Sequence, residues 1–153
     1  MTERPRDAFA ASLAALRRKE RSSAELASWL GRRGFGAEEV EGAISSLVEA
    51  GELDDERFAR RYADDKRELV GWGAERIRAA LAKRGVERAC IERALEDDSR
   101  AAQLERAAAL LERRGQALAA ESDLARALGF LTRRGYDYEI AYEAVRLAAR
   151  RAA

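Results

Sequence analysis

The apolar residues of this chain recur at helical spacing, and no stretch alternates with the period of two that is typical of a strand. They gather before and after three glycines, Gly34, Gly85 and Gly135, at positions i, i+3 and i+4, as in helices that bury one face. The sets before the glycines are Leu26, Trp29 and Leu30; Ile77, Ala80 and Leu81; and Ala127, Phe130 and Leu131. The sets after them are Val40, Ala43 and Ile44; Ile91, Ala94 and Leu95; and Ala141, Ala144 and Val145.

Each repeat has room for one more helix ahead of these two. Its apolar anchors are Phe9, Leu13 and Leu16; Phe58, Tyr62 and Leu69; and Leu104, Ala108 and Leu111. The three glycines lie 51 and 50 residues apart, so the pattern predicts an all-α protein of nine helices in three tandem three-helix repeats. We place the domains at 1–50, 51–97 and 98–153. Because a module of about 50 residues is marginal alone, we expect the repeats to dock into an elongated, curved array.

The sequence around each glycine predicts how a helix ends. The segments read WLGRRGF, ALAKRGV and FLTRRGY. A glycine just past a helix end adopts the left-handed backbone that closes a Schellman motif, and cations in the last turn suit the helix dipole. The apolar pairs that accompany this motif are Leu30 with Phe35, Leu81 with Val86, and Leu131 with Tyr136. We therefore interpret the basic doublets first as helix ends and only second as ligand-binding residues.

Two helix starts are also marked in the sequence. Ser22 and Glu25 have the spacing of a capping box. Asp54 can cap the helix that follows it, and Leu53 with Phe58 form the matching hydrophobic staple.

Composition excludes several classes of protein. The 153 residues carry a net charge of +1 and are 47% hydrophobic, but 34 of them are alanine, so large apolar side chains are scarce. With one cysteine, Cys90, and no histidine, the chain has no disulfide framework, no usual zinc site and no histidine-dependent triad. Cys90 falls on the buried face of its helix. The carboxylates stand beside arginines at helical spacing, as on a solvated face. We therefore predict a non-enzymatic protein without cofactor or metal.

The chain has no apolar run of about 20 residues, and its first residues, MTERPRDAF, are polar. We expect neither a membrane span nor a signal peptide, and a cytoplasmic location. Only 3 of the 29 basic residues are lysine. Arginine suits bidentate contact with carboxylate or phosphate, but we favour a compositional bias toward arginine and alanine as the main cause.

The middle repeat carries the clearest candidate surface. After Trp72, the residues Arg76, Ala79, Ala80 and Lys83 share one side of a helix, which makes a basic stripe over small alanines. The preceding helix adds the cations Arg57, Arg60, Arg61, Lys66 and Arg67, interspersed with carboxylates. Such a stripe fits a phosphate backbone or an acidic protein groove, and a solvated surface of mixed charge is the open alternative.

A helix-turn-helix reader of duplex DNA is a rival interpretation of three-helix modules. The third helix of the first repeat, AEEVEGAISSLVEA, carries four glutamates and no cation. Phosphates spaced at about one charge per 1.7 Å would repel it, so sequence-specific reading of duplex DNA is disfavoured.

The stretch GELDDERFARRYADDKRELVGWGAERIRAALAKRGV, residues 51–86, resembles the RecX family of RecA regulators. It carries that family's G-x-L-D-D-x-x-F-A-x-x-Y block, a Gly-aromatic-Gly turn, and an R-I-x-x-x-L-x-x-[KR]-G helix. The matching residues are Gly51, Leu53, Asp54, Asp55, Phe58, Ala59, Tyr62, Gly71, Trp72, Gly73, Arg76, Ile77, Leu81, Arg84 and Gly85. The chain departs from many relatives at Ala74, where they have proline, and at Ala79 or Ala80, where they have glutamate.

The resemblance implies a monomeric regulator of DNA repair, homologous recombination and the SOS response. Such a protein binds RecA filaments on single-stranded DNA and inhibits strand exchange and ATP hydrolysis, by blocking extension or promoting disassembly. A non-specific nucleic-acid-binding repeat protein is the alternative, and an inert scaffold for an unrelated protein is a third hypothesis. Trp72 either packs near Tyr62 and Ile77 or contacts RecA or a nucleotide base. The candidate RecA- or DNA-binding residues are Arg57, Arg60, Arg61, Lys66, Arg67, Trp72, Arg76, Lys83 and Arg84.

Overall fold

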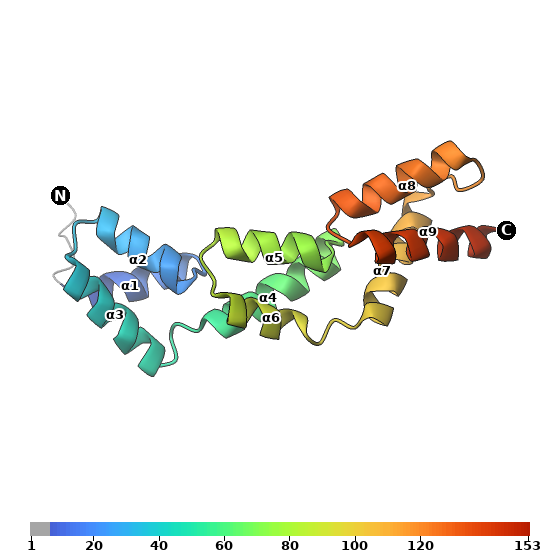
Figure 1. The fold of residues 1–153 in the computed structure, drawn as a ribbon. Helices are drawn as coiled ribbons and strands as arrows, with labels where there is room; N and C mark the ends of the chain where they lie inside the picture. The colour runs from blue at the N-terminus through green and yellow to red at the C-terminus, as the bar shows by residue number, and fades with distance from the viewer. Residues whose placement is uncertain (1–6) are drawn as a thin grey trace.

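The computed structural model describes residues 7–153, so the first six residues of the predicted first repeat lie outside the described part. Within residues 7–153 there are nine α-helices, one short π-helix and no strand, in an elongated array (Figure 1). The first repeat holds α1 (Ala8–Arg18), α2 (Ser23–Arg32) and α3 (Ala37–Glu49). The second holds α4 (Asp55–Asp65), η1 (Lys66–Val70), α5 (Ala74–Lys83) and α6 (Arg88–Leu95). The third holds α7 (Arg100–Arg114), α8 (Glu121–Arg133) and α9 (Tyr138–Ala152).

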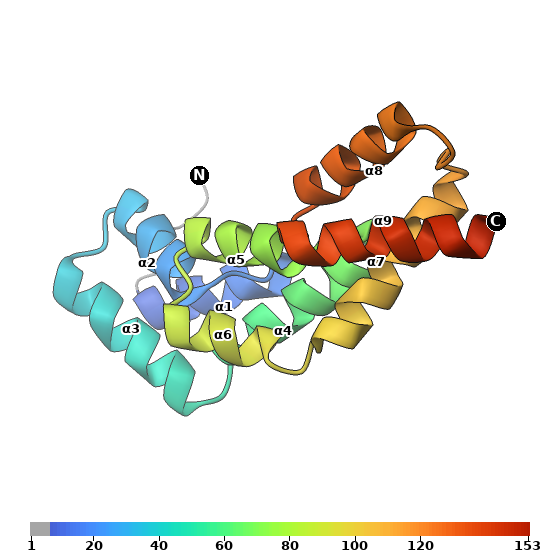
Figure 2. The same ribbon diagram turned by 45° about the vertical axis from the view of Figure 1, so that its right-hand side comes forward.

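Each group of three helices encloses its own apolar core, which confirms the predicted tandem all-α fold. Leucines dominate the first core, where Leu26, Leu30 and Leu47 are fully buried. The third core relies on alanines between α7 and α9, which let these two helices pack closely where they cross (Figure 2). Cys90 is half-buried against the second core. A low content of large apolar residues thus suffices, because each core is small.

The predicted Schellman motifs are present in all three repeats. Gly34, Gly85 and Gly135 have φ values of 92°, 79° and 99°. In each repeat the N–H after the glycine donates to the carbonyl five residues back: Phe35 to Leu30 at 3.2 Å, Val86 to Leu81 at 3.1 Å, and Tyr136 to Leu131 at 3.1 Å. The capping box at Ser22 and the Asp54 cap are also confirmed.

The helix ends at Gly85 and Gly135 also join the repeats to one another. At the end of α8, the carbonyls of Arg134 and Gly135 accept hydrogen bonds from the N–H groups of Gly73 (2.8 Å) and Glu75 (2.9 Å) at the start of α5. At the end of α5, the Arg84 carbonyl accepts from the Ser22 hydroxyl, 2.6 Å away at the start of α2. Helices α8, α5 and α2 therefore follow one another end to end along the array (Figure 1).

One predicted core anchor is wrong. Leu69 is 80% exposed, although its spacing from Phe58 and Tyr62 would place it on the buried face of a continuous α-helix. The reason is that α4 ends at Asp65 and continues as the π-helix η1. In the wider i→i+5 turn each residue rotates less about the helix axis than in an α-helix. Leu69 therefore does not reach the face that packs on the core, and it points outward.

Candidate binding groove between the first two repeats

A groove runs along the junction of the first and second repeats, where α1, α2 and the α1–α2 turn face α4, η1 and the end of α5. It consists of three connected hollows of about 360, 360 and 400 Å³. Lys19 and Arg84 line both the hollow of about 400 Å³ and one of the hollows of about 360 Å³. Glu20 and Phe58 line that same smaller hollow and the remaining one. We call this feature the junction groove. Its cations are Arg17, Lys19, Arg21, Arg32, Arg57, Arg61, Lys66, Lys83 and Arg84.

The end of the groove beside Gly85 is strongly basic. Five cations, Lys19, Arg21, Arg32, Lys83 and Arg84, face a single carboxylate, Glu25. Arg84 holds that carboxylate with two hydrogen bonds of 3.0 and 3.1 Å. Arg21 donates to the Ala15 carbonyl at 2.8 Å. This leaves Lys19, Arg32 and Lys83 to meet a ligand, so this end suits a phosphate or another anion.

The environment of Glu25 keeps it ionised. Partial burial raises the pKa of its carboxyl group, but hydrogen bonds from Arg84 and from the Ser22 N–H lower it, and the net pKa lies below the ordinary value. The Arg84–Glu25 pair also ties the end of α5 to the start of α2, so it fixes one wall of the groove.

The central part of the junction groove has an aromatic floor. Phe58 and Tyr62 stack with their ring centroids 6.3 Å apart. The Arg84 guanidinium lies 4.7 Å from the centre of the Phe58 ring, and the Lys66 ammonium lies 5.4 Å from that of Tyr62. Leu69 and Val70 of η1 form the edge of this part. Cations over aromatic rings leave a surface that is both charged and apolar.

The structure brings most of the predicted site residues together. Arg57, Arg61, Lys66, Lys83 and Arg84 line the junction groove. Two of them also contact other groups of the chain. Arg57 donates to the Gly51 carbonyl at 3.2 Å, and Arg61 lies 3.5 Å from the Glu20 carboxylate.

Trp72 and Arg76 continue the surface beyond Lys66. Trp72 meets Tyr62 edge-on at 6.4 Å, which confirms that it packs at this corner. Lys66 and Arg76 stand over its ring at 4.6 and 4.2 Å. The Arg76 guanidinium also donates to the Arg133 carbonyl at 3.3 Å, at the junction with the third repeat. A direct contact of Trp72 with RecA or a base stays a prediction.

Arg60 and Arg67 lie apart from the junction groove. Arg60 pairs with Glu56 at 3.4 Å and Asp97 at 3.2 Å. The Arg67 side chain is only 11% exposed and lies 3.3 Å from Asp98, whose side chain is 3% exposed. Arg106 of α7 pairs with the same carboxylate at 2.8 Å. This buried cluster links the second and third repeats, and it gives Arg67 a structural role.

Sequence reasoning missed the first repeat's share of the groove. Arg17, Lys19, Arg21 and Arg32 line it as well, and three of these four belong to the run RRKER at residues 17–21. That run is a usable signal of a basic surface. Its partners could not be predicted, because a contact between two repeats depends on how they dock, which the pattern within each repeat does not reveal.

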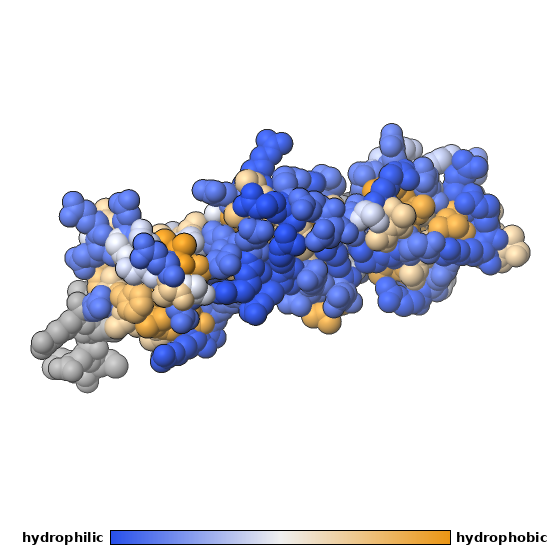
Figure 3. Space-filling model, turned by 90° about the horizontal axis from the view of Figure 1, so that it is seen from below, coloured by the Kyte–Doolittle hydropathy of each residue, from blue (hydrophilic) through white to orange (hydrophobic). Residues whose placement is uncertain are grey.

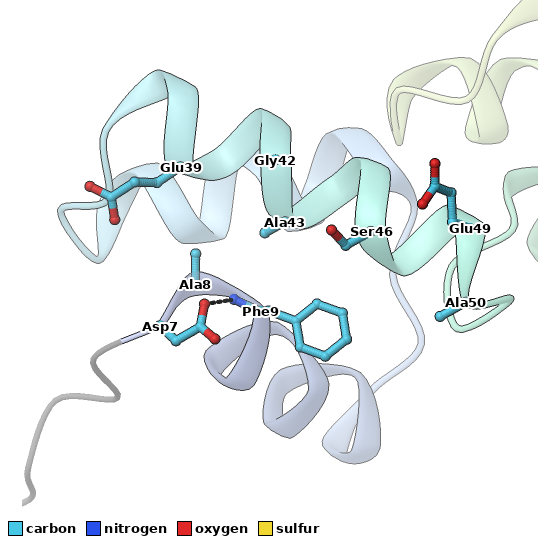
Figure 4. A pocket seen from close by; sticks show the side chains of 9 residues that line it. All are labelled: Asp7, Ala8, Phe9, Glu39, Gly42, Ala43, Ser46, Glu49 and Ala50. Carbon is cyan, nitrogen blue, oxygen red and sulfur yellow. Dashed lines mark hydrogen bonds between the residues drawn. The ribbon is translucent and has the colours of Figure 1, made fainter.

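A second cleft lies between α1 and α3 (Figure 4). It measures about 900 Å³, and small residues such as Gly42, Ala43 and Ser46 line it beside Phe9. Its charged lining residues are the carboxylates Asp7, Glu39 and Glu49. An acidic cleft repels a phosphate backbone, so it does not extend the basic groove.

The described residues contain neither a candidate metal cluster nor a helix that could span a membrane. Across residues 7–153 no group of three carboxylate or thiol side chains is placed to hold a metal ion. None of the described helices is long and apolar enough to cross a membrane. Seen from below, hydrophilic residues cover the middle of the array, and hydrophobic ones gather mainly toward its two ends (Figure 3).

Comparison with known proteins identifies the family. The family model described as RecX, second three-helix domain, matches residues 54–95. The regulatory protein RecX of Trichlorobacter lovleyi is 34% identical over 140 residues, which cover 88% of this chain and 91% of that protein. The chain belongs to the RecX family. A second RecX-family relative, the regulatory protein RecX of Thermus thermophilus, is 37% identical over 142 residues, 93% of this chain and 92% of the relative.

Solved RecX structures share the fold. The crystal structure of RecX from Lactobacillus salivarius superposes with a TM-score of 0.83 and covers 92% of this chain and 94% of that one, at 19% identity. Another crystal structure of regulatory protein RecX gives a TM-score of 0.77 at 23% identity, over 91% of this chain and 70% of that one. These likenesses concern the arrangement of the helices.

Proposed function

We propose that this RecX-family chain binds RecA filaments on single-stranded DNA and inhibits the recombinase, by blocking filament extension or promoting disassembly. The observation that carries the proposal is the similarity to regulatory RecX proteins along nearly the whole chain. In this proposal the chain acts in the cytoplasm as a monomer, without catalysis and without a cofactor.

The shape of the array supports binding to a filament. Three similar modules joined at corresponding helix ends form an elongated array that can touch successive subunits of a regular polymer. Linked contacts on one chain raise avidity by a factor of roughly 10² or more. The junction groove offers phosphate-seeking cations at one end and an aromatic, apolar surface at its centre, which suits a ligand made of both DNA and protein.

Binding to nucleic acid alone is the second candidate function. The basic end of the junction groove, with five cations and one carboxylate, favours it. Binding that depends on phosphate contacts weakens steeply as salt rises, whereas a filament contact that includes protein is less sensitive.

A pull-down on RecA–single-stranded DNA filaments, beside a binding titration on the same DNA without RecA, tests the proposal. We expect filament binding that persists at about 150 mM salt, where binding to naked DNA has largely collapsed. The double variant Lys19→Glu with Lys83→Glu places two negative charges on exposed positions of the groove, and we expect it to lose filament binding by about tenfold or more.

The control variant, Arg126→Glu with Arg150→Glu, makes the same change in net charge on exposed positions of α8 and α9. It is expected to bind filaments like the wild type. Equal binding to naked DNA and to filaments at every salt concentration would contradict the proposal and favour the second function.

A further inference from the structure

We propose that Leu69 and Val70 form an apolar knob that enters a pocket on a protein partner, and that this knob is the protein-binding element of the junction groove. The inference rests on the proposed function, in which the partner is a RecA subunit of the filament. It assigns the phosphate contact and the protein contact to different parts of the groove.

The exposure of this segment is the first observation. Leu69 is 80% exposed and Val70 is 38% exposed, side by side. A single exposed leucine is ordinary on a protein surface. Here, however, the two residues border a hollow of about 360 Å³ that Tyr62 and the buried Phe58 also line, so the exposed apolar side chains lie beside an aromatic wall. Aromatic residues and arginine are enriched in the buried centres of protein interfaces.

The backbone that presents the knob is the second observation. Residues Lys66–Val70 form a π-helix, a rare element that is found preferentially at functional sites. It ends at Gly71, whose φ of 73° places it in the left-handed region. The π-turn alone moves Leu69 from the core to the surface, so the exposure follows from the backbone and not from a loose side chain.

Contacts with the third repeat hold this backbone in place. The Arg134 guanidinium donates to the Val70 carbonyl at 2.7 Å, and the buried Tyr136 hydroxyl donates to the Gly71 carbonyl at 3.1 Å. A Cβ at Gly71 would collide with Leu110, so α7 packs directly against the turn. A knob fixed in this way loses little conformational entropy on binding, which favours affinity.

The charges around the knob indicate a protein rather than a nucleic acid. The central part of the groove holds three cations, Lys19, Lys66 and Arg84, and two carboxylates, Glu20 and Asp65. With three cations against two carboxylates, this part attracts phosphate less strongly than the basic end of the groove, where five cations face one carboxylate. A pocket on a protein partner that is apolar inside and carries both signs of charge at its rim would complement this part of the groove. The aliphatic side chains of Leu69 and Val70, by contrast, have no polar atom that could hydrogen-bond to a base.

The test compares Leu69→Ala with Val48→Ala. Val48 is a control because it is also exposed (52%) and lies on α3, outside the groove. Both truncations leave the buried cores intact, and melting temperatures measured by circular dichroism check this. We expect Leu69→Ala to weaken binding to RecA–single-stranded DNA filaments by about tenfold or more, as for a central interface residue. We expect Val48→Ala to match the wild type, and all three proteins to bind naked single-stranded DNA equally at low salt.

Each other outcome overturns the inference in a recognisable way. If Leu69→Ala binds filaments like the wild type, the knob is wrong but the proposed function stands. If it weakens binding to naked DNA to the same degree, the knob contacts nucleic acid. If the wild type dimerises in sedimentation and Leu69→Ala does not, the occupant is a second copy of this chain. If the wild type itself does not bind filaments, the proposed function fails and the inference with it.

Discussion

Replacing Gly73 by alanine is a direct test of the end-to-end joining of α8 and α5. Gly73 has φ −83° and ψ 169°, a conformation that alanine adopts without strain. A Cβ at this position would nevertheless lie 2.5 Å from the carbonyl carbon and oxygen of Gly135 and from the nitrogen of Tyr136. The third repeat must therefore move away from the second.

The cost can be worked out from the contacts that the movement disturbs. Overpacking typically costs about 1–3 kcal/mol. The two inter-repeat hydrogen bonds from Gly73 and Glu75, at 2.8 and 2.9 Å, contribute about 0.5–1.5 kcal/mol each. Alanine recovers about 0.4–1 kcal/mol by restricting the unfolded chain. The sum is a net loss of about 1–6 kcal/mol with its centre near 3 kcal/mol, and at about 2–4 °C per kcal/mol for a chain of this size that central value lowers the melting temperature by about 6–12 °C.

Thermal unfolding followed by circular dichroism measures this loss, and Gly42→Ala is the matched control. Gly42 lies inside α3, where an added methyl group would have no atom within 4 Å, so alanine there should stabilise the chain by about 0.5–1 kcal/mol. The melting temperatures of the two glycine variants are thus expected to shift in opposite directions from that of the wild type. A Gly73→Ala protein that melts within about a degree or two of the wild type would refute the close end-to-end contact between α8 and α5.

Two further predictions concern charged side chains at the repeat junctions. Asp98→Asn leaves Arg67 and Arg106 without their shared, 3% exposed carboxylate, and a loss of about 3–5 kcal/mol is expected in urea unfolding. Asp97→Asn, where the side chain is 78% exposed, should cost under about 1 kcal/mol, and equal costs would contradict the buried cluster. Glu25→Gln should destabilise the chain at pH 7, and since the folded pKa of Glu25 is lowered, its contribution is present above the ordinary value of 4.5 and lost as pH falls through the folded value. Urea midpoints of wild type and Glu25→Gln should therefore converge on acidification, and a constant gap from pH 7 to pH 3 would show that the ionised pair is not responsible.

Most of the fold could be predicted because each repeat carries its own local signals. The spacing of Leu26, Leu30 and their counterparts defines the buried helix faces, and Gly34, Gly85 and Gly135 mark the helix ends. These signals act within a few residues of one another, so a pattern along the chain is enough to detect them. The prediction failed at Leu69, where the periodicity continues in the sequence but the backbone changes to a π-turn.

The site was only partly predictable, because it is made by contacts between repeats. Lys83 and Arg84 stood out as a basic doublet, yet their neighbours across the junction groove, such as Lys19 and Arg21, lie about 60 residues earlier in the chain. Arg67 looked like one more surface cation, and only the packing of α7 buries it against Asp98. Side chains of the same type thus took different roles according to how the repeats dock.

If this chain acts on the RecA filament, as proposed, it should slow ATP hydrolysis by RecA on single-stranded DNA. The rate of that hydrolysis can be measured while the protein is titrated in. We expect inhibition at amounts equal to or below those of RecA, weakened in the Lys19→Glu, Lys83→Glu double variant and unchanged in the Arg126→Glu, Arg150→Glu control. An unaltered rate at a molar excess of folded wild-type protein would contradict the proposal.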